Sequence, residues 1–210
     1  EYTPTDGWEL PDLRTAVDRI KQAILKSESI CVWGDFDVDG QTSTSLLVQT
    51  LRALGADVHW HIPLRATESH GIKIPYLKEV IDNGAELILT CDTGIGEHDA
   101  IDYANSRGVD VVVTDHHDLP ETLPNALALV DPKRLPEEHP LATLPGVGVA
   151  YKLAEKLLEN HSSPITHHAL LDLVALGITA DVAALHGDAR YLLQRGLIEL
   201  RQTKRIGLQT

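Results

Sequence analysis

Acidic and imidazole side chains gather directly after three short apolar runs of the sequence. In chain order they are Asp35, Asp37 and Asp39, then Asp92, then Asp115, His116 and His117. Carboxylates that lie together repel one another unless positive charge is supplied, and a divalent cation can supply it. Carboxylate oxygens with one or two imidazoles suit Mn²⁺ or Mg²⁺, whereas a structural zinc site would use thiolates. A pair of such ions about 3.5–4 Å apart can activate water and stabilise the leaving oxygen of a phosphoester, so the pattern predicts metal-assisted phosphoryl hydrolysis.

A parallel sheet would bring the three acidic groups together. Five short apolar runs bounded by turn or charged residues predict its strands, at residues 29–34, 57–62, 86–91, 109–114 and 126–130. Segments with helical spacing lie before and between them, at residues 13–26, 42–54, 75–83 and 97–107. The repeated strand-helix-strand unit predicts an α/β fold, namely a doubly wound, mostly parallel sheet with helices on both faces. Ligands bind at the carboxyl ends of such strands, where the acidic groups should converge.

The last third of the sequence predicts a helical C-terminal segment without further strands. Its helices are expected at residues 149–160, 167–178 and 189–202. A chain of 210 residues with 43% hydrophobic residues has enough apolar material for a sizeable core. We expect one catalytic domain over residues 1–210, with an α/β core at 1–145 and a helical part at 146–210.

Composition limits the class of protein. Cys31 and Cys91 both lie in apolar runs, which predicts reduced core thiols and a reducing compartment. No apolar run reaches about 18 residues and no signal-peptide pattern appears, so we expect a cytoplasmic protein. The formal charge of −13 argues against a broad basic surface for nucleic acid, but bound divalent ions would offset the charge of an acidic catalytic site. The absence of methionine leads us to expect a piece of a longer chain.

Each acidic group also has a purely structural explanation. Asp37 and Asp39, followed by Gly40, could begin a helix; residues 92–94 could form a turn; Asp115 could cap a loop. That explanation requires three unrelated turns to place five aspartates and two histidines at one sheet edge. A shared metal site is therefore favoured.

Four segments, in order, resemble the motifs of the DHH phosphoesterases. They are residues 34–40 (GDFDVDG) with Thr42 and Ser43, residues 92–94 (DTG), residues 115–117 (DHH) and residues 170–182 (LLDLVALGITADV). The last segment resembles the RecJ branch of that family, as do residues 62–65, 144–153 and 205–208. The resemblance covers nearly the whole chain, from about residue 10 to residue 208.

The resemblance implies a set of metal ligands, which are Asp37, Asp39, Asp92, His116 and Asp181. Asp92 is then the bridge between two Mn²⁺ or Mg²⁺ ions. Asp35 and Asp115 fall in the motifs as ligands or as groups that support ligands, and a carboxylate such as Asp115 beside a ligating imidazole would fix its tautomer. His117 would face the scissile phosphate as a hydrogen-bond donor or proton source.

Substrate contacts and departures from the family also follow from the resemblance. Arg65 and Arg190 match basic positions that could hold phosphates, although solvated surface arginines are an equally good explanation. Trp33 stands where many relatives outside the RecJ branch have a histidine, so the first metal site would lack that imidazole. His70 takes the place of a tyrosine that could face the substrate. Asp131 replaces an asparagine and would add negative charge near a phosphate route.

Three other patterns have bland explanations. Residues 144–148 resemble a DNA-binding hairpin, but a glycine turn that begins a helix is preferred because the paired preceding helix is missing. His59 and His61 share one face of a strand and are interpreted as packing or solvated side chains. His167 and His168 are interpreted as surface residues.

The function implied by the resemblance is two-metal hydrolysis of phosphodiester bonds, as a 5′ to 3′ exonuclease on single-stranded DNA in repair or recombination. The alternatives are a phosphodiesterase of short oligonucleotides or cyclic dinucleotides, a pyrophosphatase, and an inactive module that binds DNA or a partner protein. Exonucleases of this kind carry a DHH-associated domain and often an oligonucleotide-binding domain, which this sequence lacks. We therefore expect weak DNA binding, and contacts with replication or repair proteins through those absent domains.

Overall fold

Five parallel strands form the centre of the fold in a computed structural model, which describes residues 2–209. They are β1 (Ile30–Trp33), β2 (Val58–His61), β3 (Leu87–Cys91), β4 (Asp110–Thr114) and β5 (Ala128–Val130). The order across the sheet is β2-β1-β3-β4-β5, and every neighbouring pair is parallel. The expected doubly wound α/β fold is confirmed. Because the winding reverses between β1 and β3, the ends of these two strands define the crevice where such sheets bind ligands.

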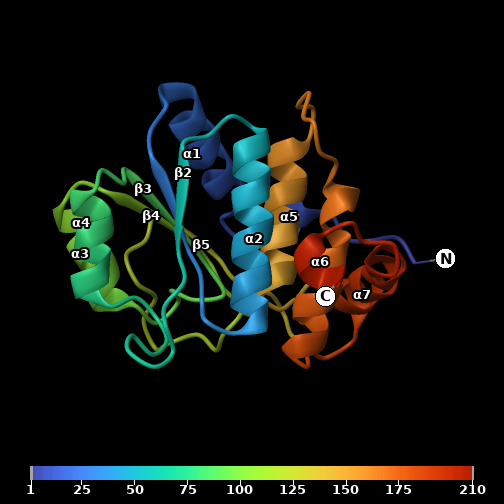
Figure 1. The fold of residues 1–210 in the computed structure, drawn as a ribbon. Helices are drawn as coiled ribbons and strands as arrows, with labels where there is room; N and C mark the ends of the chain where they lie inside the picture. Colours follow the sequence, from blue (N-terminus) through green and yellow to red (C-terminus); the bar gives the residue numbers. More distant parts are fainter. Residues whose placement is uncertain (1, 210) are drawn as a thin grey trace.

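Helices cover both faces of the sheet (Figure 1). On one face lie α3 (Ile74–Asp82) and α4 (His98–Ser106); on the other lie α1 (Leu13–Lys26), α2 (Val38–Ala53) and α5 (Gly146–Leu158). Side chains of β1 alternate between the two cores: Ile30 and Val32 face the α2 side, whereas Cys31 and Trp33 face the α3 side. This alternation arises because successive side chains of a strand point to opposite faces of the sheet, and both faces are buried here.

The C-terminal part is helical, as expected, and packs on α2. It contains η3 (His167–Leu170), α6 (Leu171–Ala180), α7 (Gly187–Leu200) and α8 (Ile206–Gln209). Both α5 and α6 contact α2, and α7 packs against α6 (Figure 1). Two further short 3₁₀ turns are η1 (Gly7–Glu9) and η2 (Pro132–Arg134). No helix in the described part of the chain is long and apolar enough to cross a membrane.

Helix starts are where the sequence predictions were least accurate. Helix α1 has the predicted bounds, but α2 begins at Val38, four residues before the predicted start, because the Asp37 side chain accepts a hydrogen bond from the Gly40 N–H and caps the helix. Helix α5 begins at Gly146 and not at residue 149, and the predicted helix at 167–178 is divided into η3 and α6. Both glycine-rich and polar helix starts were therefore predicted too late.

Candidate metal centre

The predicted acidic groups meet at the carboxyl ends of the central strands. Asp35, Asp37 and Asp39 follow β1, Asp92 directly follows β3, and the segment 115–117 follows β4. The first four lie at the crevice between β1 and β3, where the winding of the sheet reverses, and the last segment lies at the end of the neighbouring strand β4. The fold thus brings together residues that are up to 82 positions apart in the sequence, from Asp35 to His117.

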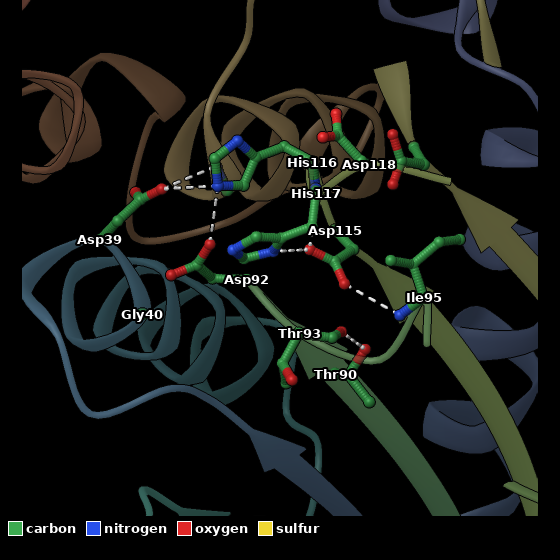
Figure 2. A network of polar contacts seen from close by, with 12 residues as sticks. Asp39, Gly40, Thr90, Asp92, Thr93, Ile95, Asp115, His116, His117 and Asp118 are labelled. Atoms are coloured by element: carbon green, nitrogen blue, oxygen red, sulfur yellow. Dashed lines mark hydrogen bonds and ion pairs between the residues drawn. The ribbon is translucent and has the colours of Figure 1, made fainter. Parts of the chain in front are cut away.

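His116 lies at the centre of the cluster. Its Nε2 atom is 3.0 Å from Asp92 Oδ1, 3.8 Å from Asp39 Oδ2 and 3.9 Å from Asp181 Oδ1. Figure 2 shows the imidazole of His116 between the carboxylates of Asp39 and Asp92. One imidazole surrounded by three carboxylates is a set of ligands that suits Mn²⁺ or Mg²⁺.

Asp92 belongs to two groups of potential ligands. It lies with Asp35 and Asp37 on one side and with His116 and His117 on the other, and in each group the ligand atoms are within 4.8 Å of one another. Asp39, His116 and Asp181 form a third group, whose ligand atoms also lie within 4.8 Å of one another. A carboxylate shared between adjoining groups has the position required of a bridge between two ions.

The local backbone and burial of Asp92 distinguish it from an ordinary turn residue. Its φ of 60° is in the left-handed region, which is uncommon for residues other than glycine and is typical of functional sites. The side chain is only 2% exposed, and Oδ1 accepts no hydrogen bond because the contact with His116 does not have hydrogen-bond geometry. Asp35 Oδ1 is likewise buried without a hydrogen bond. Buried oxygens without partners fit a site that binds cations.

Burial and mutual repulsion raise the pKa values of the cluster. Burial, followed by the negative charges of Asp37 and Asp115, raises the pKa of Asp92 to about 9. Burial, followed by the charge of Asp92, raises the pKa of Asp39 to about 8. Burial also raises the pKa values of Asp35 and Asp181. These carboxylates cannot all ionise at neutral pH without added positive charge, so the chemistry of the set fits divalent cations.

Asp39 is held by the N-terminus of a helix that is distant in the sequence. Its Oδ2 accepts a hydrogen bond of 2.7 Å from the Gly146 N–H, and its Oδ1 accepts one of 2.9 Å from the Val147 N–H. These amides begin α5, where the helix dipole favours a negative charge. The glycine-turn interpretation of residues 144–148 was right that a helix begins in this region, but it placed the start three residues too late and missed the carboxylate that the first amides bind.

Two glycines allow this close approach, a role that sequence reasoning did not assign to either of them. A Cβ atom on Gly146 would lie 2.6 Å from the Cβ atom of Asp92, and one on Gly177 would lie 2.8 Å from Asp39 Oδ1. The signals available in the sequence were the glycines themselves, at the start of α5 and within the largely apolar α6.

Asp115 supports the DHH segment, but through a different ring from the one expected. Its Oδ1 lies 2.7 Å from Nδ1 of His117. From His116 the same oxygen accepts only the backbone N–H and does not contact the ring. The second oxygen accepts the Ile95 N–H at 2.9 Å. Burial alone would raise the pKa of Asp115, but the hydrogen bonds and charge of His117 outweigh it and lower that pKa. The hydrogen bond that His117 Nδ1 donates to Asp115 in turn raises the pKa of His117 to about 9.

Asp37 combines both readings of the first motif. Its Oδ1 accepts the Gly40 N–H at 2.9 Å and caps α2, as the structural explanation predicts. The same side chain lies in the ligand group with Asp35 and Asp92. The helix cap therefore orients a potential ligand and does not replace the metal-site interpretation. The Asp35 side chain belongs to the same group, which favours the ligand alternative for it.

The structure separates the three predicted substrate contacts. The guanidinium of Arg65 lies 5.0 Å from the centre of the Phe36 ring, and Phe36 stands between the first two aspartates of the cluster in the sequence. His70 is exposed and close enough to Asp35 to oppose the rise in its pKa. Arg190 is exposed on α7, and no hydrogen bond or ion pair joins it to the cluster within residues 2–209. The first two lie beside the site, whereas a role for Arg190 stays a prediction.

Two departures from the family pattern lie in the interior. Trp33 is fully buried, packs on the His61 ring with 4.1 Å between centroids, and belongs to the α3-side core. Asp131 was expected to add charge to an open phosphate route, but it does not. Its side chain is fully buried, and its Oδ1 accepts the Lys133 N–H at 2.8 Å. Burial raises the pKa of Asp131 to about 7.

The predictions for His59, His61 and His168 agree with the structure, whereas His167, predicted at the surface, is half-buried beside Tyr151. His61 Nε2 lies 2.7 Å from Glu68 Oε2 and packs on Trp33, whereas His59 is exposed beside Asp57. His168 is exposed and stacks on His167, with 4.2 Å between ring centroids. None of these side chains belongs to a group of potential ligands in the described chain.

Comparisons with known proteins agree with this geometry. Among curated proteins, the single-stranded-DNA-specific exonuclease RecJ of Bacillus subtilis (strain 168) is 41% identical over 204 residues, which cover 97% of this chain and 25% of the relative. A crystal structure of exonuclease RecJ bound to manganese is 37% identical with a TM-score of 0.88, covering 98% of this chain and 52% of the other. RecJ from Thermus thermophilus in complex with Mn²⁺ is 36% identical with a TM-score of 0.83, covering 96% and 29% of the two chains.

The family match covers the part of the chain that builds the site. The present chain spans only 25% and 36% of the length of two curated RecJ relatives, so it corresponds to a part of them. The family described as "DHH family, N-terminal domain" matches residues 29–178, which include every strand and the segment from Asp35 to His117. On this match, the chain belongs to the DHH family.

Proposed function

We propose that this chain is the catalytic part of a two-metal phosphodiesterase that degrades single-stranded DNA from its 5′ end. The observation that carries the proposal is Asp92, a buried carboxylate with one unpaired oxygen that is shared by two groups of potential ligands. The names of the relatives, which are single-stranded-DNA-specific exonucleases, and the manganese in two related structures support the choice of substrate and metal.

In this proposal two Mn²⁺ or Mg²⁺ ions occupy the cluster. Asp35 and Asp37 would hold one ion, Asp39, His116 and Asp181 would hold the other, and Asp92 would bridge them. When bound, such ions lower the pKa of a water molecule and stabilise charge on the phosphate oxygens. The helix N-terminus at Gly146 and Val147 fixes Asp39, and the Asp37 cap fixes the start of α2, so the ligands are positioned before substrate arrives.

His117 is placed to act on the substrate. Its Nδ1 is tied to Asp115, and Figure 2 shows the other ring nitrogen directed toward Asp92. Its side chain is 57% exposed, so a phosphate at the cluster can reach it. During hydrolysis a water oxygen bonds to phosphorus and gives up one proton, the bond from phosphorus to the leaving oxygen breaks, and the leaving oxygen takes up one proton. We assign to His117 the hydrogen bond to the phosphate or the leaving oxygen.

The cellular setting completes the proposal. Cys31 and Cys91 are both buried and free, which agrees with a reducing compartment, and we place the enzyme in the cytoplasm in DNA repair or recombination. The relatives are longer than this chain, so we propose that strong DNA binding and contacts with replication or repair proteins require other parts of such proteins.

The test compares substrates in the presence of Mn²⁺. Single-stranded oligonucleotides labelled at the 5′ or 3′ end, a dinucleotide, a cyclic dinucleotide and pyrophosphate are incubated with the chain and with Asp92→Asn. We expect mononucleotides released from the 5′ end of DNA by the unsubstituted chain alone. Rapid cleavage of the dinucleotides without any DNA product would contradict the DNA substrate, and the absence of hydrolysis of every substrate would contradict the enzymatic function.

A further inference from the structure

A cavity of about 330 Å³ opens beside the metal-site cluster. Its polar lining contains His116, His117 and Asp181, which belong to the cluster, together with Lys133. The rest of the lining is largely small or apolar and includes Ala142 and Ala183. The volume lies at the lower end of the range for small-molecule sites, and a lining of both kinds suits a nucleotide with a phosphate and a less polar sugar and base.

Lys133 supplies the positive charge that this cavity needs. It is the single lysine or arginine among the described residues that line the cavity. The chain carries a formal charge of −13, and the adjoining cluster is rich in carboxylates, so a cation beside the cluster helps an anionic substrate to approach. A phosphate that enters beside His116 and His117 therefore finds its favourable charge at Lys133.

The backbone that carries Lys133 is fixed on both sides. The buried Asp131 side chain accepts the Lys133 N–H at 2.8 Å and caps η2. The Arg134 side chain donates to Asp12 Oδ2 at 2.7 Å and also to the Leu129 carbonyl. Lys133 thus projects from a short turn that is anchored to β5 and to the start of α1. Asp131, which departs from the family pattern, gains a structural role as the anchor of this lysine.

The ammonium group itself is available to a ligand. Lys133 Nζ lies 3.3 Å from Asp118 Oδ1, but the Asp118 side chain is 96% exposed and the Lys133 side chain is 46% exposed. An exposed ion pair of this kind contributes little to stability and exchanges readily with a competing anion. A phosphate can therefore replace Asp118 without disturbing the fold.

We propose that Lys133 and this cavity form a phosphate subsite that holds a nucleotide of the DNA strand next to the scissile bond. The proposal rests on the proposed function and extends it, because it names a residue that binds the substrate outside the metal ligands. The bound group is either the terminal 5′ phosphate or an internal phosphodiester, since both present the same anionic oxygens to Lys133.

The test measures both binding and turnover with Lys133→Gln, with Lys133→Arg and with Lys26→Gln as the matched control. Lys26 is also an exposed lysine beside a carboxylate, with Nζ 3.6 Å from Glu28. It ends α1 just before β1 begins, so it lies at the amino end of that strand, whereas the cluster lies at the carboxyl ends. Binding of a fluorescent single-stranded oligonucleotide is followed by anisotropy in Ca²⁺ over a range of salt concentrations. Turnover is measured in Mn²⁺ with 5′-phosphorylated and 5′-hydroxyl oligonucleotides.

We expect Lys133→Gln to reduce the slope of log affinity against log salt by about 0.7, the value for one phosphate contact on a single strand. KM should rise about tenfold with little change in kcat, and Lys133→Arg should restore both. Lys26→Gln should behave as the unsubstituted chain. An effect confined to 5′-phosphorylated DNA identifies the terminal phosphate, and an effect on both substrates identifies an internal one.

The outcomes separate this subsite from the proposed function. An unchanged slope and KM in Lys133→Gln, a loss of kcat alone, or no measurable binding by the unsubstituted chain would overturn the subsite. If the unsubstituted chain binds DNA but does not cleave it, the proposed function fails, and the binding slopes still decide the role of Lys133.

Discussion

His116 and His117 are neighbours in the sequence but have different surroundings. The Nε2 atom of His116 faces three carboxylates of the cluster, the nearest 3.0 Å away. The His117 ring is tied to Asp115 through Nδ1 and remains largely exposed. A half-buried imidazole among carboxylates suits a metal ligand, whereas an exposed imidazole oriented by a carboxylate suits a donor to substrate.

Replacing His117 should therefore impair turnover more than metal binding. In His117→Gln we expect kcat to fall roughly 10²–10⁴-fold, the contribution typical of a proton donor, while the affinity for Mn²⁺ changes little. Single-turnover kinetics and titration calorimetry with Mn²⁺ measure the two effects. His59→Gln is the control, because His59 is also an exposed histidine beside an aspartate but lies outside the cluster. Equal losses of turnover and metal affinity would make His117 a ligand.

At the scale of elements, the site depends on contacts between helices that are distant in the sequence. Helix α5 presents its first two amides to Asp39 on α2, and α6 packs against α2 through Gly177. A Cβ atom on Gly177 would lie 2.5 Å from Thr42 Oγ1 and 2.8 Å from Asp39 Oδ1. The glycine keeps α6, and with it Asp181 at the end of that helix, close to the ligands on α2.

We predict that Gly177→Ala separates α6 from α2 and weakens the metal site. The added methyl group should cost about 1–3 kcal/mol of stability, as overpacking in a core does, and should reduce Mn²⁺ affinity because Asp39 or Asp181 must shift. Thermal unfolding and Mn²⁺ titration measure both effects. Gly207→Ala is the control, since Gly207 is also helical and a Cβ atom there meets nothing within 4 Å. Native Mn²⁺ affinity in Gly177→Ala would show that this contact does not position the ligands.

Elements were more predictable than the contacts between them. Four of the strands could be located because they are apolar runs buried on both faces, whereas the edge strand β2 exposes His59 and Trp60. The cluster could be located because its residues follow the strand ends. The hydrogen bonds from Gly146 and Val147 to Asp39 join residues more than 100 positions apart, so no local pattern predicts them. The sequence reasoning expected Asp115 beside the ligating imidazole and not beside His117, because both DHH rings are within its reach along the chain.

The interior position of Asp131 escaped prediction for a different reason. A carboxylate after a strand is expected to face solvent or a ligand, and only the three-dimensional structure shows that this one turns inward to cap η2. The same turn fixes Lys133, whose location at the cavity could not be inferred from an isolated lysine in the sequence.

At the scale of the whole molecule, the α/β core and the helical part share one hydrophobic core. Buried residues from α1, β1 and α2 and from α5, α6 and α7 belong to the same cluster. A buried ion pair adds a polar connection: Lys152 Nζ on α5 lies 2.8 Å from Asp188 Oδ2 on α7 and donates to the Thr5 carbonyl at 2.8 Å. The assignment of residues 1–210 to one domain stays a prediction, and this shared core supports it.

One domain should unfold in one transition. We expect calorimetry of the chain to give a single peak whose calorimetric and van't Hoff enthalpies agree. Asp188→Asn should lower the free energy of unfolding by about 3–5 kcal/mol, because it leaves Lys152 charged and buried without its partner, and should move the whole peak. Two separate transitions, with only one of them shifted by the substitution, would divide the chain into two domains.

Stability should also depend on pH through Asp131. Because burial raises the pKa of this carboxyl to about 7, the native state retains a proton that the unfolded chain has already lost above its ordinary pKa of 3.8. The contribution of the protonated Asp131 carboxyl to the free energy of unfolding is complete below that ordinary pKa and is lost as the pH rises through about 7. Asp131→Asn removes this loss, so the variant should gain roughly 1–3 kcal/mol relative to the unsubstituted chain between pH 5 and pH 8.

Denaturant unfolding at several pH values measures the effect of Asp131. Asp118→Asn serves as the control, because that carboxylate is 96% exposed and should alter stability equally little at each pH. A difference between Asp131→Asn and the unsubstituted chain that is the same at pH 5 and pH 8 would mean that Asp131 is ionised in the native state throughout this range.

The central claim is that the cluster binds two ions bridged by Asp92. The most direct test is the stoichiometry of Mn²⁺ binding, measured by titration calorimetry with electron paramagnetic resonance, on the unsubstituted chain and on Asp92→Asn. Asparagine tolerates the left-handed backbone at this position, so the fold should be preserved. We predict two magnetically coupled Mn²⁺ ions per unsubstituted chain and at most one, uncoupled, in Asp92→Asn. A single ion in the unsubstituted chain, or two coupled ions in the variant, would contradict the account.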